Sequence, residues 1–149
     1  MAQKEQKNST IRITNQYIKD LSFEIPKAPQ IFTKKIEKPK VDISVDINAT
    51  KLNDTFYEIN LKIASTSSTD EDELFILELD YCGIFEITGK EQEELEQILL
   101  IYCPNILFPF ARRIIANATS DGGFAAMLID PIDFVALYQK RKSQNEQKS

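Results

Sequence analysis

The sequence has 149 residues, of which 42% are apolar, and its 18 basic and 23 acidic side chains give a net charge of −5. This length suits one domain with a real hydrophobic core, and the composition excludes fibrous and disordered proteins. Residues 11–138 hold 12 basic and 21 acidic groups, a net of −9. Such a body would repel phosphate, so nucleic acid is not an expected partner.

Hydropathy and cysteine usage indicate the compartment. No apolar run approaches the ~20 residues of a membrane span, and the polar N-terminus lacks the apolar core of a signal peptide. Cys82 and Cys103 are isolated in apolar stretches, which favours reduced, buried thiols over a disulfide between them. We therefore expect a cytoplasmic protein without direct membrane insertion.

Four segments show the alternation of a half-buried strand. The first is 11–25, and the others are 41–47, 56–65 and 74–87. In the first, one side collects Ile11, Ile13, Tyr17, Leu21, Phe23 and Ile25, with Ile18 as the exception. The long connection at 26–40 has the length of a functional loop. The last strand is apolar on both sides, which predicts cover on both faces and, in so short a chain, burial against another copy.

Helical patterns follow the strands. Residues 91–101 have acids in the first turn and an apolar stripe. Pro104 and Pro109 then interrupt an apolar run, and because proline breaks helices we expect one helix to end and another to begin at 110–118. Asp130 and Pro131 have the pattern of a helix start. Four antiparallel strands followed by two or three helices predict an α+β domain.

Several kinds of chemistry lack their usual residues. The sequence has no histidine and no glycine-rich phosphate loop. Its two cysteines are too far apart for a zinc or dithiol motif. The acidic turn at 70–73 lacks the spacing of a calcium loop, so a solvated turn is the better interpretation. We expect no enzyme, no cofactor and no metal site.

Four segments, in the same order, resemble the bacterial SecB protein-export chaperones. They are Tyr17–Pro29 (YIKDLSFEIPKAP), Gly83–Ile87 (GIFEI), Tyr102–Arg112 (YCPNILFPFAR) and Asp130–Leu137 (DPIDFVAL). The resemblance covers residues 11–138 and implies a SecB-like domain that assembles as a dimer of dimers, a homotetramer. Residues 1–10 would be a flexible N-terminus and 139–149 a flexible basic tail. This tail departs from the family, whose tails are commonly acidic or rich in Gln and Glu.

The resemblance also implies an acidic docking surface. Asp20, Glu24, Ile76 and Glu78 match residues with which SecB proteins receive the small, basic, zinc-bearing tail of the SecA ATPase. The residues alone leave an ordinary solvated sheet face as the alternative. Charge complementarity of this kind sets on-rate and salt dependence more than affinity.

Two apolar sets have implied roles as well. Leu77, Leu79 and Tyr81 match positions used in tetramer assembly, although the core of a single chain is a serious alternative. A client-binding groove would be lined by Ile31, Phe32, Val41, Ile43, Val45, Leu137 and Tyr138, which the sequence cannot separate from core residues. Groove walls beside the free backbone groups of a strand edge would bind many sequences.

The sequence is thus interpreted as an ATP-independent holdase. It would bind unfolded precursor proteins, keep them competent for translocation and deliver them to SecA. Two alternatives stay open: a SecB-like chaperone dedicated to one client such as an antitoxin, and an α+β domain that binds or converts a small molecule.

Overall fold

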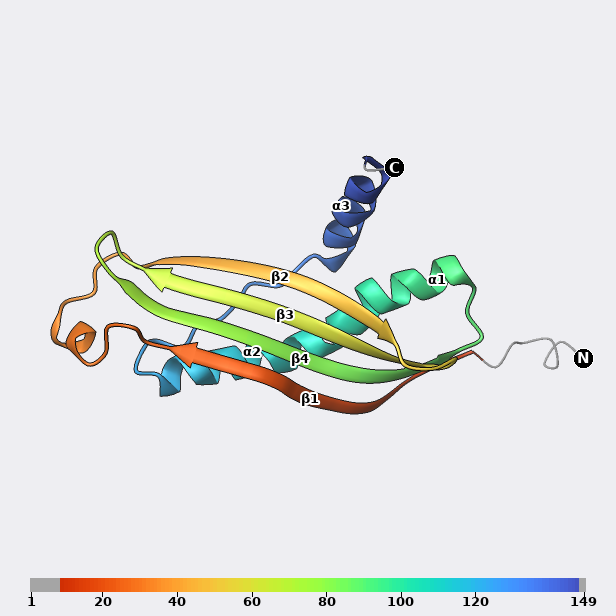
Figure 1. Ribbon diagram of the computed structural model, residues 1–149, viewed down its shortest axis with the longest axis horizontal. Helices are drawn as coiled ribbons and strands as arrows, with labels where there is room; N and C mark the ends of the chain where they lie inside the picture. Colours follow the sequence, from red (N-terminus) through yellow and green to blue (C-terminus); the bar gives the residue numbers. More distant parts are fainter. Residues whose placement is uncertain (1–8, 148–149) are drawn as a thin grey trace, which may run out of the picture.

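The protein folds into one antiparallel sheet with helices on one side (Figure 1). This computed structural model describes residues 9–147, so most of the predicted N-terminal segment 1–10 lies outside the described residues. The strands are β1 (Thr10–Glu24), β2 (Lys40–Lys51), β3 (Phe56–Ser68) and β4 (Glu73–Thr88). Their order across the sheet is β1-β4-β3-β2, so β1 and β2 form the two edges. The α+β prediction is confirmed.

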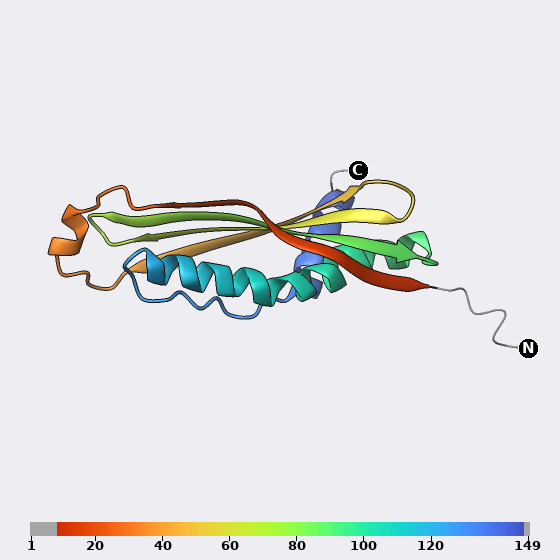
Figure 2. The ribbon, with the colours of Figure 1, turned by 90° about the horizontal axis from the view of Figure 1, so that it is seen from below.

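The helices follow β4 and cover a single face. They are α1 (Gln92–Gln97), the π-helical turn η3 (Ile98–Tyr102), α2 (Cys103–Asp121) and α3 (Phe134–Gln147). Figure 2 shows α2 running along one face of the sheet, while no helix among residues 9–147 covers the opposite face. We call these the helix face and the open face. In Figure 1, α3 lies beyond the edge formed by β2.

The core lies between α2 and the two central strands. The alternating residues of β3 and β4 that face α2 are almost all buried, and from α2 itself Leu107, Ala111 and Ile115 are 0% exposed. Gly83 permits this close packing, because a Cβ on it would lie 2.9 Å from Leu107 Cδ2 and 2.8 Å from Phe85 Cε1.

The two prolines do not end the helix, contrary to the sequence-based expectation. Helical structure is continuous from α1 through η3 to α2. Pro104 falls in the first turn of α2, where its missing N–H is tolerated, and η3 absorbs the change in hydrogen bonding before it. There the Asn105 side chain donates to the Ile101 carbonyl at 3.0 Å. Pro109 lies inside α2 on its exposed side.

This continuous helix also revises the hydropathy argument. Residues 92–121 form a helix of 30 residues that is long and apolar enough to cross a membrane by length and composition alone. In the structure it packs along the sheet, which explains its apolar composition.

Two register irregularities change which face the residues of β1 occupy. They fall between Ile13 and Asn15 and between Ile18 and Asp20. An extra residue in a strand reverses the alternation that follows it. Tyr17 therefore pairs with Cys82 on the open face, and Ile18 pairs with Tyr81 on the helix face. The predicted sides of Tyr17 and Ile18 were the reverse and are corrected.

The last helix begins three residues later than predicted and extends further. Asp133 is its N-cap, because the Asp133 carboxylate accepts a hydrogen bond of 3.0 Å from the Ala136 N–H. Asp130 and Pro131 precede it in a segment without regular structure. Residues 139–147, expected in the tail, continue α3; Lys148 lies outside the described residues.

Candidate functional site

The open face brings together the residues of the predicted SecA surface. Glu24 pairs with Ile76, and the Ser22–Glu78 pair lies between the rows of Glu24 and Asp20. Side chains two residues apart on a strand share a face. The three carboxylates and Ile76 therefore form one patch, with Asp20 and Glu24 roughly 13 Å apart along β1. We call this the acidic patch.

Cations on the open face are held by other acids. Lys19 pairs with Glu58 at 3.2 Å, Lys62 with Asp80 at 3.7 Å, and Arg12 with Glu86 at 3.4 Å. Within the described part of the chain, no ion pair involves any of the three acids of the acidic patch. Their charges are therefore available to a basic partner.

A partly exposed network lies next to this patch on the same face. The Tyr17 hydroxyl and the Lys19 ammonium both donate to the Glu58 carboxylate. The bond from Tyr17, together with that from Lys19, holds the pKa of Glu58 below its ordinary value, although burial opposes this. The negative charge of Glu58 is thus balanced by its ion pair with Lys19. The carboxylates of the acidic patch have no such ion pair among the described residues.

The edge of β2 presents free backbone groups. In an antiparallel pair, alternate residues direct both N–H and C=O either into the ladder or away from it. The Leu52 N–H donates to the Phe56 carbonyl at 2.9 Å, and the Ile47 carbonyl accepts from Arg141 instead of β3 at 2.7 Å. Given the register with β3, the backbone N–H and C=O groups of the odd-numbered residues from Val41 to Ile47 point away from β3, at the open edge of the sheet.

The side chains of these same residues lie on the helix face. Val41 is 46% exposed and Ile43 43%, whereas Val45 is half-buried and Ile47 is buried. No backbone hydrogen bond to another described segment involves Val41, Ile43 or Val45. A row of apolar side chains therefore accompanies a row of unused donors and acceptors, and we call this the β2 edge.

Five of the seven predicted groove residues are accessible along the β2 edge or at its two ends. Phe32 is 47% exposed at the start, and Val45 and the half-buried Leu137 lie at the far end. Ile31 and Tyr138 are 2% and 7% exposed, so these two are buried in the single chain and are not part of its accessible surface.

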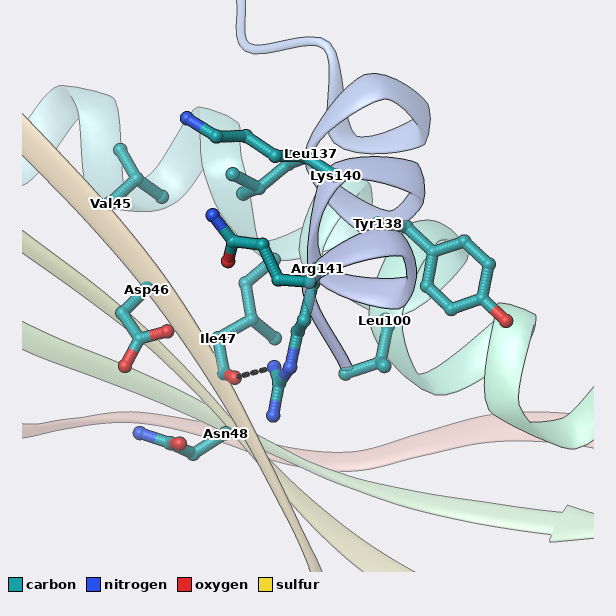
Figure 3. Close-up of a pocket in the computed structure, with 10 residues that line it drawn as sticks. Val45, Asp46, Ile47, Asn48, Leu100, Leu137, Tyr138, Lys140 and Arg141 are labelled. Carbon is teal, nitrogen blue, oxygen red and sulfur yellow. Dashed lines mark hydrogen bonds between the residues drawn. The ribbon is translucent and has the colours of Figure 1, made fainter. Parts of the chain in front are cut away.

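The far end of the β2 edge opens into a pocket between β2 and α3 of about 380 Å³. Figure 3 shows Val45 and Ile47 on the strand side, Leu100 at the base, and Leu137, Lys140 and Arg141 on α3. The Tyr138 ring points away from β2. Its hydroxyl is buried without a hydrogen-bond partner in the described structure.

The near end is formed by the 26–40 loop, which is fixed by contacts that the sequence did not suggest. Lys27 and Lys34 donate to the two carboxylate oxygens of Asp72 at 2.9 and 3.3 Å. The bond from Lys27, joined by that from Lys34, lowers the pKa of Asp72 from its ordinary value. Phe32 packs on Phe124 with ring centroids 5.4 Å apart.

These aromatic contacts continue into the sheet. Phe124 packs on Phe75 and Phe75 on Phe23, each with ring centroids 5.3 Å apart. Phe124 follows the Gly122–Gly123 turn and belongs to no periodic pattern, so only the folded chain reveals its role.

The residues predicted for the tetramer interface lie in the core of the single chain. Leu77, Leu79 and Tyr81 are 0%, 1% and 7% exposed beneath the helices. Tyr81 stacks on Phe110 of α2 with ring centroids 6.4 Å apart. The structure thus fits the alternative interpretation as core residues, and their role in assembly stays a prediction.

Both cysteines are free and buried on different elements. Burial raises the pKa of the Cys82 thiol to about 11 and that of Cys103 to about 12, so neither is an activated nucleophile. Among the described residues, no group of three His, Cys, Asp or Glu side chains is placed to hold a metal ion.

Comparison with known proteins identifies the family. A family model described as "Preprotein translocase subunit SecB" matches residues 3–145. The chain belongs to the SecB family. Over 134 residues it is 44% identical to the protein-export protein SecB of Parvibaculum lavamentivorans, which covers 90% of this chain and 80% of the relative. It is also 44% identical to the SecB of Rickettsia felis over 137 residues, which cover 91% of this chain and 90% of the relative.

A solved structure supports the fold. The SecB-like chaperone of Mycobacterium tuberculosis, in complex with a ChAD peptide from an antitoxin, superposes with a TM-score of 0.68 over 82% of this chain and 90% of that one. Its sequence identity is only 11%, so this likeness concerns the fold. The family match and the SecB relatives support a role as a chaperone in protein export.

Proposed function

We propose that this SecB protein is an ATP-independent holdase that binds unfolded precursor proteins along the β2 edge and delivers them to SecA from the acidic patch. The observation that carries the proposal is the coincidence, on Val41, Ile43 and Val45, of accessible apolar side chains with outward backbone groups. Folded proteins hide both features, so selectivity would come from a client's unfolded state.

An extended client would bind as an added strand. Its backbone would pair with the outward N–H and C=O groups, and alternate side chains would rest on the apolar row. Because backbone groups are common to all sequences, this mode tolerates many clients. The pocket beside α3 and the Phe32–Phe124 contact would hold larger anchors at the two ends.

SecA would meet the opposite side of the sheet. The acidic patch presents carboxylates that have no cation partner among the described residues, which suits a basic tail. The client and SecA would therefore bind at once, since the β2 edge has its side chains on the helix face. Assembly as a dimer of dimers in the cytoplasm would multiply these weak sites and raise the affinity for long chains.

The test of client binding uses a denaturant-diluted secretory precursor and light scattering without nucleotide. Replacing Val41 and Ile43 together by Ser should weaken suppression of aggregation. Asp54→Asn, in the exposed loop after β2, is the control and should act as wild type. Equal suppression by the double variant would contradict a site on the β2 edge.

The test of SecA binding uses the isolated basic tail and calorimetry. The triple variant D20N/E24Q/E78Q should bind several-fold more weakly, because exposed charges contribute about 0.2–1 kcal/mol each, and the deficit should shrink in high salt. Glu86→Gln removes a charge from the same face but one already paired with Arg12, so it should bind nearly normally. An equal loss of affinity for the tail in both variants would refute binding at the acidic patch.

The alternative of a chaperone dedicated to an antitoxin gains no support from this chain's own features. The curated relatives at 44% identity are named protein-export proteins. Capture of only one protein class by the purified chain would favour that alternative.

A further inference from the structure

The end of the β2 edge is basic, and the charges come from α3. Arg141 and Lys140 both line the pocket beside Val45 and Ile47. The Arg141 Nη1 donates to the outward Ile47 carbonyl at 2.7 Å, so the guanidinium occupies the next outward carbonyl after Val45. Figure 3 shows Arg141 reaching down to the strand and Lys140 extending toward the Val45 side.

Neither cation is neutralised within the described part of the chain. No ion pair within 4.0 Å involves Arg141 or Lys140. Asp46 lines the same pocket, and Glu96 and Glu146 line adjoining depressions together with Arg141. Guanidinium carries five N–H donors, and a single one is bonded to Ile47. The remaining donors can accept a carboxylate with charge-assisted hydrogen bonds.

We propose that Arg141, assisted by Lys140, selects client segments that carry an acidic side chain at the end of their apolar stretch. This inference rests on the proposed function, because it assigns a charge preference to the same β2 edge. An added strand that covers Val41 to Val45 meets Arg141 where it stops, so an Asp or Glu there gains a partner. A Lys at the same place meets like charge and binds more weakly.

The arrangement separates two partners by charge. Acidic client ends are attracted to α3, beyond the β2 edge (Figure 1), and are repelled by the acidic patch. A basic partner has the opposite preference. The basic character of α3, which departs from the usual SecB tail, thus gains a function at the client site.

The test measures fluorescence anisotropy of labelled nine-residue peptides with alternating apolar residues. One peptide is neutral, and the others place Glu or Lys at either the first or the last position. At low salt, Glu at one end should tighten binding about threefold to tenfold over the neutral peptide, as expected for a charge-assisted contact at a partly exposed site. Lys at that end should weaken binding.

Variants assign the preference to its residues. Arg141→Gln should abolish most of the preference for Glu, measured as the ratio of the affinities of the Glu and neutral peptides for the same variant. Lys142→Gln is the matched control, since it removes the same charge from the same helix without lining this pocket, and it should keep the preference.

The outcomes are distinguishable. Equal binding of neutral and Glu peptides to the wild type, or equal loss in the Arg141 and Lys142 variants, would overturn the charge preference while leaving the holdase intact. If no peptide bound, the neutral one included, the proposed client site itself would be overturned.

Discussion

Replacing Ile43 by Pro tests whether clients pair with the β2 edge through their backbones. The N–H of Ile43 points away from β3, so its loss leaves the ladder of the folded sheet intact. A client strand loses one hydrogen bond, which contributes about 0.5–1.5 kcal/mol. This corresponds to binding weaker by about twofold to twelvefold. The comparison is with Ile43→Ala, which removes the side chain but keeps the N–H.

The neighbouring residue supplies the control. The register directs the Ser44 N–H into the ladder toward Ala64, so Ser44→Pro should lower the free energy of unfolding by about 1–3 kcal/mol. Peptide anisotropy and urea unfolding together measure both effects. If Ile43→Pro bound clients as tightly as Ile43→Ala, or lost as much stability as Ser44→Pro, the assignment of outward groups to clients would be refuted.

Three further predictions concern the scaffold. Gly83→Ala should lower the free energy of unfolding by about 1–3 kcal/mol, because the new methyl group collides with Leu107; unchanged urea midpoints would contradict the close packing of α2. The pKa of Asp72 is lowered, so its bond to Lys27 stabilises the 26–40 loop fully above about pH 4, the ordinary range of Asp, and this stabilisation is lost as pH falls through the lowered pKa. Hydrogen exchange of the loop should therefore speed up in acid in the wild type but not in Asp72→Asn. The same pH dependence of loop exchange in both proteins would argue against the contact. Asp133→Ala should speed exchange at the start of α3 by removing a cap that stabilises it by about 1 kcal/mol, and unaltered protection would place the helix start elsewhere.

Local patterns predicted the elements but not all of their faces. Alternation located each of the four strands, because burial of one sheet face imposes a period of two. It could not show the irregularities at Thr14 and Lys19, since a bulge depends on pairing with β4. This is why Tyr17 and Ile18 were assigned to the wrong faces.

Proline and cap positions show the same limit. A π-helical turn before Pro104 keeps the helix continuous, and nothing in the apolar run signals that turn. Asp130 and Asp133 both fit a helix start, and only the bond from Ala136 decides for Asp133.

The candidate site divides in a similar way. The resemblance to SecB proteins implied the acidic patch, and Asp20 and Glu24 share a face because both follow the second irregularity of β1. The burial of Ile31 and Tyr138 depends on tertiary packing. The contact of Arg141 with Ile47 joins residues 94 positions apart, which no local pattern reveals.

Native mass spectrometry of the purified protein, alone and with a denaturant-diluted secretory precursor, tests the central claim most directly. Without nucleotide, we expect a tetramer that gains one precursor chain and ignores the same precursor once it has folded. A monomer that captures nothing would contradict the account, because the family fold would then be present without a holdase.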